Sequence, residues 1–319
     1  MKAPHQSGAP VALPADDAVI IFRTKRSGVH GRLVRTGAVA DQILRAHAMP
    51  DAASEALGEG LVLAALLGSA LPGDGNISVQ TRTNGVVSVL YADCEAPGKL
   101  RGYARYDAGK LAALPESGQT FEAASILGDG HLAITIDQGD AAERYQGVIG
   151  LEGASLDVAA AAYFEQRENL PTFVRLAVAW HYAGAQTGLP AAMRWRGGGI
   201  MMQRLENGTD ETGDDPWLRV RMLTATIEDH ELLDPSLPPE RLLLRLFHEE
   251  GVIVERVVPL DVYCKCSRHK ILSVLTAFGA DELSDMRNDD GKIAVTCEFC
   301  AETYTFDPAE LALPFSNGA

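Results

Sequence analysis

The chain has 319 residues, of which 46% are hydrophobic and 22% are charged, a balance that excludes a wholly disordered or collagen-like polypeptide. Its formal net charge of −15 disfavours nucleic acid and anionic membranes as partners, because both bind through positively charged surface. The five cysteines are too few for a secreted scaffold built on disulfides. The length predicts about two domains.

The beginning of the chain predicts a cytoplasmic protein. Residues 1–16 lack the apolar segment of a signal peptide, and we expect them to form a mobile tail. The most apolar segment, residues 61–71, is shorter than the ~18 residues that a membrane-spanning helix needs. We therefore expect no membrane partner and a compartment that keeps thiols reduced.

Residues 17–204 predict an N-terminal domain with an α+β fold, in which helices pack on an antiparallel sheet. Successive short strands joined by turns favour antiparallel pairing, and Asn84-Gly85 is typical of a tight hairpin turn. The expected helices span 52–71 and 155–169. The expected strands span 18–23, 77–82, 86–93, 100–106, 131–137 and 144–151.

The next region predicts a helical, metastable linker over residues 205–261. Before it lies a glycine run at 197–199, which we interpret as a flexible junction, and it opens with a polar acidic stretch at 206–216. Helical patterns follow at 217–227 and 239–249. Helices this short are marginal alone and depend on packing against a neighbour.

Residues 262–319 predict a small C-terminal module with a metal site. Cys264 and Cys266 are followed, after thirty residues, by Cys297 and Cys300. Two close pairs of thiolates can supply the four vertices of one tetrahedral centre. Zn²⁺ is the expected ion because it favours tetrathiolate coordination and has no redox chemistry of its own.

The same four cysteines are also compatible with unrelated thiols or with a purely structural zinc site. Their spacing permits a redox switch as well. A metal ion joins distant positions, whereas disulfides within each pair would close small loops that contribute little stability. Four cysteines allow three disulfide connectivities, and proximity along the chain favours pairing within each pair. Oxidation with that pairing would release the metal and unfold the module.

The cysteine pattern and several longer blocks resemble the heat shock protein 33 family of redox-regulated bacterial chaperones. The CxCSR…CxxC arrangement is similar to the redox switch of that family, and the resemblance covers most of the chain. The chain departs from the family in its longer N-terminal tail and in the acidic stretch of the linker. The matching blocks are GRLVR (31–35), GEGLVLAALLGS (58–69), LRGYAR (100–105), the region 132–153, YFEQRENLPT (163–172) and LLLRLFHEE (242–250).

The resemblance implies an ATP-independent holdase that is inactive when reduced and zinc-bound, and that is activated by oxidation with release of zinc. It implies that Cys264, Cys266, Cys297 and Cys300 are both zinc ligands and switch cysteines, forming Cys264–Cys266 and Cys297–Cys300 bridges when oxidised. It also implies unfolded client proteins as partners and a homodimer as the active form. We expect no catalytic residue and no enzyme activity.

The two helical segments of the linker are candidates for client binding, because loss of the module would remove the support of marginal helices. Large exposed apolar surface is the expected property of a protein that captures unfolded polypeptides. The expected client-binding residues are Trp217, Leu218, Met222, Leu242, Leu246 and Phe247.

Two other functions compete with the chaperone interpretation. A zinc ribbon that binds nucleic acid is disfavoured because residues 262–319 contain five basic and nine acidic residues. A thiol–disulfide oxidoreductase would place its CxxC motif at the start of a helix, whereas we expect Cys297 and Cys300 between two strands.

No Gly-Lys pair is followed by Ser or Thr, so we expect no P-loop for ATP. Cys94 is expected to be a strand-end or partly buried thiol, and His269 is not needed as a ligand.

Overall fold

The computed structural model describes residues 13–71, 73–114, 126–138, 144–183, 192–204 and 215–311. The chain divides into two compact units, Met1–Val262 and Tyr263–Ala319. Most of the predicted N-terminal tail and of the acidic stretch at 206–216 lies outside the described residues.

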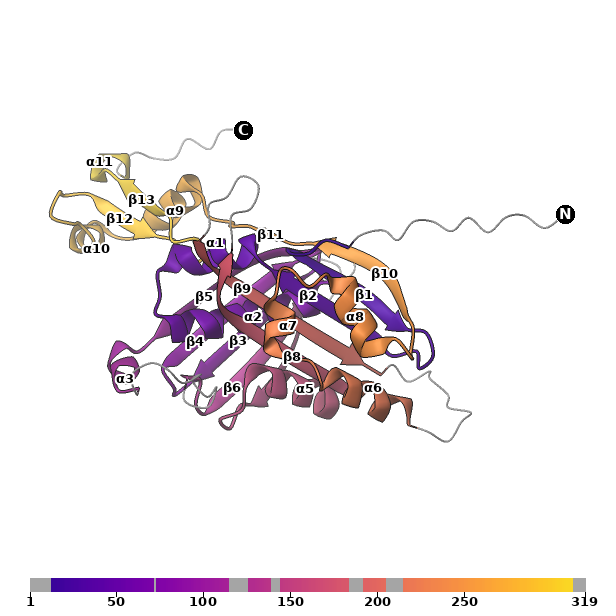
Figure 1. Ribbon diagram of the computed structural model, residues 1–319. Coiled ribbons are helices and arrows are strands. Elements are labelled where there is room, and N and C mark those ends of the chain that lie inside the picture. Colours follow the sequence, from indigo (N-terminus) through magenta and orange to yellow (C-terminus); the bar gives the residue numbers. More distant parts are fainter. Residues whose placement is uncertain are drawn as a thin grey trace. The chain divides into compact units, whose positions relative to one another are not determined.

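The first unit contains two sheets and most of the helices labelled in Figure 1, and it confirms the predicted α+β fold with antiparallel sheets. Its strands are β1 (Ala18–Thr24), β2 (His30–Thr36), β3 (Asn76–Thr83), β4 (Val87–Glu95), β5 (Lys99–Tyr106), β6 (Gly130–Asp137), β7 (Tyr145–Gly150), β8 (Thr172–Ala183), β9 (Ala192–Gln203), β10 (Val252–Pro259) and β11 (Asp261–Val262). Its helices are α1 (Ala38–His47), α2 (Asp51–Gly68), α3 (Ala108–Ala112), α5 (Leu156–Arg167), α6 (Pro216–Thr224), α7 (Asp229–Leu233) and α8 (Pro239–Phe247).

The six-stranded sheet has the order β11-β5-β4-β3-β6-β7, and the five-stranded sheet has the order β10-β1-β2-β9-β8. All neighbours pair antiparallel except β11, which pairs parallel with β5. Strands β3 and β4 form the hairpin that Asn84-Gly85 predicts. The turn needs glycine for space, because a Cβ on Gly85 would lie 2.3 Å from the carbonyl oxygen of Leu127.

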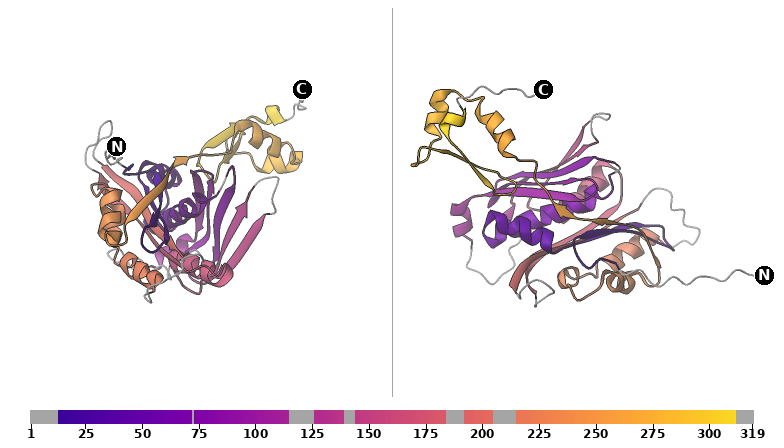
Figure 2. Two further views of the ribbon diagram at one scale, coloured as in Figure 1. Left: turned by 90° about the vertical axis from the view of Figure 1, so that its right-hand side faces the viewer. Right: turned by 90° about the horizontal axis from the view of Figure 1, so that it is seen from above.

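Helix α2 packs against both sheets, contacting β3, β4 and β5 of one and β2, β8 and β9 of the other (Figure 2). It is apolar on nearly every side from Leu61 to Leu67, as expected for a helix buried on all faces. Two glycines permit the close approach. A Cβ on Gly58 would lie 2.6 Å from Val178, and a Cβ on Gly60 would lie 2.6 Å from Leu90. The larger hydrophobic core of the unit is therefore built around α2.

The other face of the five-stranded sheet carries a second hydrophobic core, which α6, α7 and α8 cover. Helix α8 presents a strongly apolar side to this core, and its remaining residues are polar or exposed. The sheet contributes the buried side chains Ile20, Phe22, Leu33, Ala177, Ile200 and Met202, and the helices contribute Val220, Leu232, Leu233, Leu242, Leu243, Leu246 and Phe247.

The segment predicted as a linker, residues 205–261, is described from residue 215 and lies in the first unit. Besides helices α6 and α8, which its patterns predict, it contains α7 and strand β10. Strand β10 was not predicted, and it pairs antiparallel with β1 from Ala18↔Pro259 to Thr24↔Val252. This segment therefore extends one sheet as well as covering its face.

The prediction of a flexible junction at the glycine run is wrong. Gly197, Gly198 and Gly199 are buried inside β9, where they pair with both β2 and β8. A Cβ on Gly198 would lie 2.7 Å from the carbonyl oxygen of Leu232 in α7, and one on Gly199 would lie 2.7 Å from Val62 in α2. The run thus lets a helix pack closely on each face of the sheet.

Two buried arginines hold α7 and the loop after it on this sheet. Arg35 in β2 donates hydrogen bonds to main-chain oxygens of three residues between 231 and 237. Arg196 in β9 donates through Nε to the carbonyl oxygen of Leu233 at 2.7 Å and pairs with the carboxylate of Asp16. Because buried donors are costly when unpaired, these bonds hold α7 and the loop after it on strands β2 and β9.

Gly198→Val should lower the free energy of unfolding of the first unit by roughly 1–3 kcal/mol, the usual cost of overpacking a filled site. The reason is that the added side chain meets the main chain of α7. Denaturant unfolding followed by circular dichroism measures the change. Gly150→Ala is the matched control, because its new Cβ would have no neighbour closer than 3.6 Å. Equal midpoints for the two variants would contradict the packing assigned to Gly198.

The second unit is small and has little core. It contains α9 (Arg268–Leu275), α10 (Ala280–Asp285), β12 (Ile293–Thr296), β13 (Thr303–Phe306) and α11 (Pro308–Leu311). Strands β12 and β13 form a two-stranded antiparallel sheet. Among its described residues the buried hydrophobic core consists of Leu275, Ile293 and Phe306. Small domains with so few buried side chains need an additional cross-link, such as a disulfide or a metal.

No helix in the described part of the chain is both long enough and apolar enough to cross a membrane.

Candidate metal centre

The first cysteine pair lies in the extended segment between β11 and α9. The main-chain N–H of Cys266 donates to Sγ of Cys264 at 3.4 Å, which folds the segment around the first sulfur. Ser267 then caps α9 by accepting a hydrogen bond from the N–H of Lys270 at 3.2 Å. This cap starts the helix directly after the pair.

The second pair lies in the turn that connects β12 to β13. The N–H of Cys297 donates to the carbonyl oxygen of Glu302 at 2.9 Å, and the N–H of Ala301 donates to the carbonyl oxygen of Cys297 at 2.9 Å. Ala301 has a φ of 57°, the left-handed conformation in which the tight turn closes. The hairpin therefore holds Cys297 and Cys300 on one loop.

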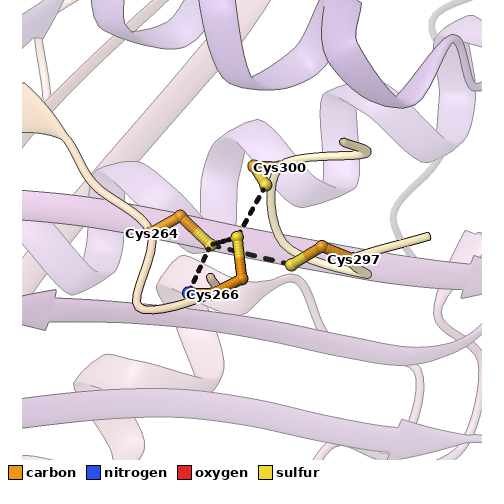
Figure 3. Close-up of side chains that lie close together, drawn as sticks. All are labelled: Cys264, Cys266, Cys297 and Cys300. Atoms are coloured by element: carbon orange, nitrogen blue, oxygen red, sulfur yellow. Dashed lines mark hydrogen bonds between the residues drawn. The ribbon is translucent and has the colours of Figure 1, made fainter. Parts of the chain in front are cut away.

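The four sulfur atoms lie within 4.8 Å of one another, and all four side chains are partly buried (Figure 3). The distance from Cys264 Sγ is 3.1 Å to Cys266 Sγ and 3.6 Å to Cys297 Sγ, and Cys266 Sγ lies 3.4 Å from Cys300 Sγ. No disulfide joins them. In the described residues no other cluster of three or more His, Cys, Asp or Glu side chains has such spacing. The four cysteines are thus positioned to hold a metal ion, as the sequence predicts.

The ionisation of these thiols is interdependent. Burial raises the pKa of Cys264 and that of Cys300. Burial also opposes ionisation of Cys266, but hydrogen bonds from Tyr304 and the neighbouring thiols outweigh it and lower the pKa of Cys266. Four thiolates so close together repel one another unless a cation neutralises part of their charge. The donor set therefore fits a soft divalent metal, which removes this repulsion.

The other candidate residues lie apart from the cluster. His269 is exposed on α9 and is not among the clustered side chains. Cys297 and Cys300 lie in a hairpin turn and not at a helix start, unlike the CxxC of a thiol–disulfide oxidoreductase. Cys94 lies next to the last residue of β4 in the first unit, so the prediction of a strand-end thiol is confirmed. Its side chain is fully buried, which is more than the partial burial expected.

The residues predicted to bind clients differ in their exposure. Leu218 and Met222 on α6 are 50% and 64% exposed, and they line an apolar surface hollow of about 520 Å³. Trp217 is partly buried. The remaining three, Leu242, Leu246 and Phe247, are buried in the core between α8 and the sheet.

Comparison with known proteins places this fold and cysteine cluster in a family. A family model described as Hsp33 protein matches residues 17–307. The chain belongs to the Hsp33 family. It is 41% identical to the 33 kDa chaperonin of Caulobacter vibrioides, over 92% of this chain and 95% of the relative. It is 33% identical to that of Ectopseudomonas mendocina, over 91% and 92%.

A solved Hsp33 structure has the same fold. The crystal structure of the 33 kDa chaperonin of Thermotoga maritima, an Hsp33 homologue, matches with a TM-score of 0.73 and 23% identity, covering 92% of this chain and 96% of that one. Together with the relatives named as chaperonins, membership of the Hsp33 family supports a chaperone function for this chain.

Sequence reasoning missed two contacts, one at the metal centre and one in the first unit. The hydroxyl of Tyr304 lies 3.3 Å from Cys266 Sγ, a contact across 38 positions that no spacing rule reveals. Arg35 belongs to a block that carries the family resemblance. Its hydrogen bonds to main-chain oxygens of Glu231 and Asp234 depend on the register of the sheet, which the sequence does not reveal.

Reaction with a maleimide should separate Cys94 from the four clustered thiols. Burial raises the pKa of Cys94 to about 12, so both its thiolate fraction and its accessibility are low. After metal chelation under reducing conditions at pH 7.5, we expect four thiols to react at least about 100-fold faster than the fifth. Mass spectrometry counts the adducts.

The control for this measurement is Cys94→Ala, which should leave four fast adducts unchanged. Denaturant should make the fifth thiol of the unsubstituted protein reactive. Fast labelling of Cys94 in the folded protein would contradict its placement in the core.

Proposed function

We propose that this protein is a redox-regulated, ATP-independent holdase whose four clustered cysteines hold Zn²⁺ in the reduced, inactive state. The observation that carries the proposal is the set of four partly buried sulfur atoms within 4.8 Å, in a unit with a core of three side chains among its described residues. Zn²⁺ suits four thiolates, and in small modules its binding contributes about 10–16 kcal/mol that is inseparable from folding. Loss of the ion would therefore unfold the second unit.

In the proposed switch, oxidation of the cysteine thiolates causes release of the metal. A thiolate attacks peroxide, the O–O bond breaks, hydroxide leaves and the sulfur becomes a sulfenic acid; a neighbouring thiolate then displaces a second hydroxide and forms a disulfide. In the proposed switch the bridges are Cys264–Cys266 and Cys297–Cys300. The 3.1 Å between Sγ of Cys264 and Sγ of Cys266 is shorter than the 3.6 and 3.4 Å contacts between the pairs and supports the first bridge; proximity along the chain supports the second. Bridges between the pairs would keep the long-range cross-link and leave the module closed, so peptide mapping of the oxidised protein tests the pairing.

The proposed client surface has an exposed and a covered part. Leu218 and Met222 already border an apolar hollow on α6, where an unfolded segment can make its first contact. Leu242, Leu246 and Phe247 become accessible only when α8 leaves the sheet, which would also expose apolar side chains of the sheet itself. Oxidation would thus enlarge a small apolar patch into a surface of the kind that captures unfolded proteins.

The cellular setting follows from the same chemistry. A thiol switch works from a reduced resting state, so we propose a cytoplasmic location. We propose unfolded proteins as partners and a homodimer as the oxidised form. The net charge of −15 supports the absence of a nucleic-acid partner.

Suppression of client aggregation without ATP tests the proposal. We expect the reduced, zinc-loaded protein to leave aggregation unchanged and the peroxide-treated protein to suppress it at near-stoichiometric ratios, with loss of suppression after thiol reduction plus Zn²⁺. Light scattering of a chemically denatured client diluted into buffer is the measurement. Cys94→Ala should behave like the unsubstituted protein. Equal suppression by the reduced and oxidised forms would contradict the switch.

Substitution of the exposed pair on α6 tests the client surface. Leu218→Ser combined with Met222→Ser should weaken suppression by the oxidised protein several-fold, because two accessible apolar contacts are lost. It should leave zinc content unchanged, since both residues lie outside the second unit. Val274→Ser, which removes a side chain 60% exposed on α9, is the matched control. Undiminished suppression by the double variant would exclude this hollow from client binding.

A further inference from the structure

Tyr304 occupies a position beside the sulfur cluster that the proposed switch does not use. It lies in β13, opposite Val295 of β12. Its ring is partly buried and packs against the core of the second unit, on the same side of the strand as Phe306. The hairpin therefore fixes the ring and, through it, the position of the phenolic oxygen.

The hydroxyl of Tyr304 lies between the sulfur of Cys266 and the carboxylate of Glu302. Its oxygen is 3.3 Å from Sγ of Cys266, and it donates to Oε2 of Glu302 at 3.2 Å. A phenol has one proton to donate. When Cys266 is a thiol, its S–H can donate to the phenolic oxygen while that oxygen donates to Glu302. When Cys266 is a metal-bound thiolate it has no proton, so the hydroxyl must donate to the sulfur for the contact to remain a hydrogen bond.

We propose that Tyr304 is a positioning residue that donates a hydrogen bond to the metal-bound sulfur of Cys266 and slows release of the metal, an inference that rests on the proposed metal centre. Groups that form hydrogen bonds to metal ligands orient those ligands and tune their electronic properties. A hydrogen bond to a thiolate draws charge from the sulfur. The sulfur then gives its electron pair less readily to a proton, or to peroxide with cleavage of the O–O bond and departure of hydroxide.

Glu302 competes for the same proton. Its carboxylate accepts from the Tyr304 hydroxyl at 3.2 Å, which weakens the bond to sulfur. Its negative charge also lies beside a cluster that is itself negative, since four thiolates exceed the charge of a divalent ion by two. The pair thus acts in opposite directions: Tyr304 retains the metal, and Glu302 moderates that retention.

The test uses the full-length reduced protein loaded with Zn²⁺, or with Co²⁺ as a spectroscopic probe. The variant Tyr304→Phe keeps the ring and removes the hydroxyl. We expect Zn²⁺ transfer to a chromophoric chelator, and zinc release by peroxide, to become about 3- to 10-fold faster. The sulfur-to-cobalt charge-transfer band should shift to longer wavelength, because the sulfur electrons lie higher without the hydrogen bond. A merely structural role would not move this band.

Two further variants test whether the Tyr304 hydroxyl acts through its hydrogen bond to Cys266. Thr303→Val removes a hydroxyl from the adjacent residue of the same strand, one that contacts Thr296 across the hairpin, and it should leave the release rates and the band unchanged. Glu302→Ala should slow zinc release, because the Tyr304 proton is then shared with no carboxylate. In the Tyr304→Phe background the Glu302 substitution should lose most of this effect, which separates the shared proton from a simple change of charge.

Release rates and a cobalt band in Tyr304→Phe equal to those of the unsubstituted protein would overturn the proposal while leaving the metal centre intact. Full additivity of the Glu302 and Tyr304 substitutions would also overturn it, because the two side chains would then act separately. If the unsubstituted protein binds neither ion, the metal centre itself fails, and the inference about Tyr304 fails with it.

Discussion

The meeting of four sulfur atoms from two distant segments is the constraint on which the second unit depends. The pairs are separated by thirty residues of sequence, and in the fold they approach within 4.8 Å. Three buried hydrophobic side chains accompany them in the described part of the unit. Such a core is too small to support a domain of this length alone. A metal ion on the four sulfurs would supply a cross-link that the hydrophobic effect does not.

The first unit, in contrast, has two large hydrophobic cores. Its main core surrounds α2 and joins the two sheets. The outer face of the five-stranded sheet is covered by α6, α7 and α8, which lie between β9 and β10 in the sequence. The space left by Gly198 and the donors of Arg35 and Arg196 hold this cover in place. In the proposed function, this cover conceals the larger part of the client surface.

Sequence reasoning succeeded where a local rule applies. The hairpin at Asn84-Gly85 follows from turn chemistry, and the cysteine cluster follows from ligand spacing and the preference of thiolates for one centre. The glycine run in β9 was misread because glycine is typical of loops, whereas here it makes room for Leu232 and Val62 on opposite faces of a strand. The contact of Tyr304 with Cys266 and the role of Arg35 depend on tertiary packing, which no spacing in the chain reveals. Strand β10, by contrast, is rich in the β-branched residues Val and Ile at 252–258, a signal for a strand that the sequence offers.

The most direct test of the central claim separates loss of the metal from formation of disulfides. Hydrogen exchange is measured on the full-length protein when reduced and zinc-loaded, when reduced and chelated, and when oxidised by peroxide. We expect the amides of β12 and β13 to be protected in the first state and to lose at least about 100-fold of that protection in both others, since the metal binding energy is folding energy. An oxidised, zinc-free protein in which these strands remain protected would contradict the claim that the metal holds this unit together.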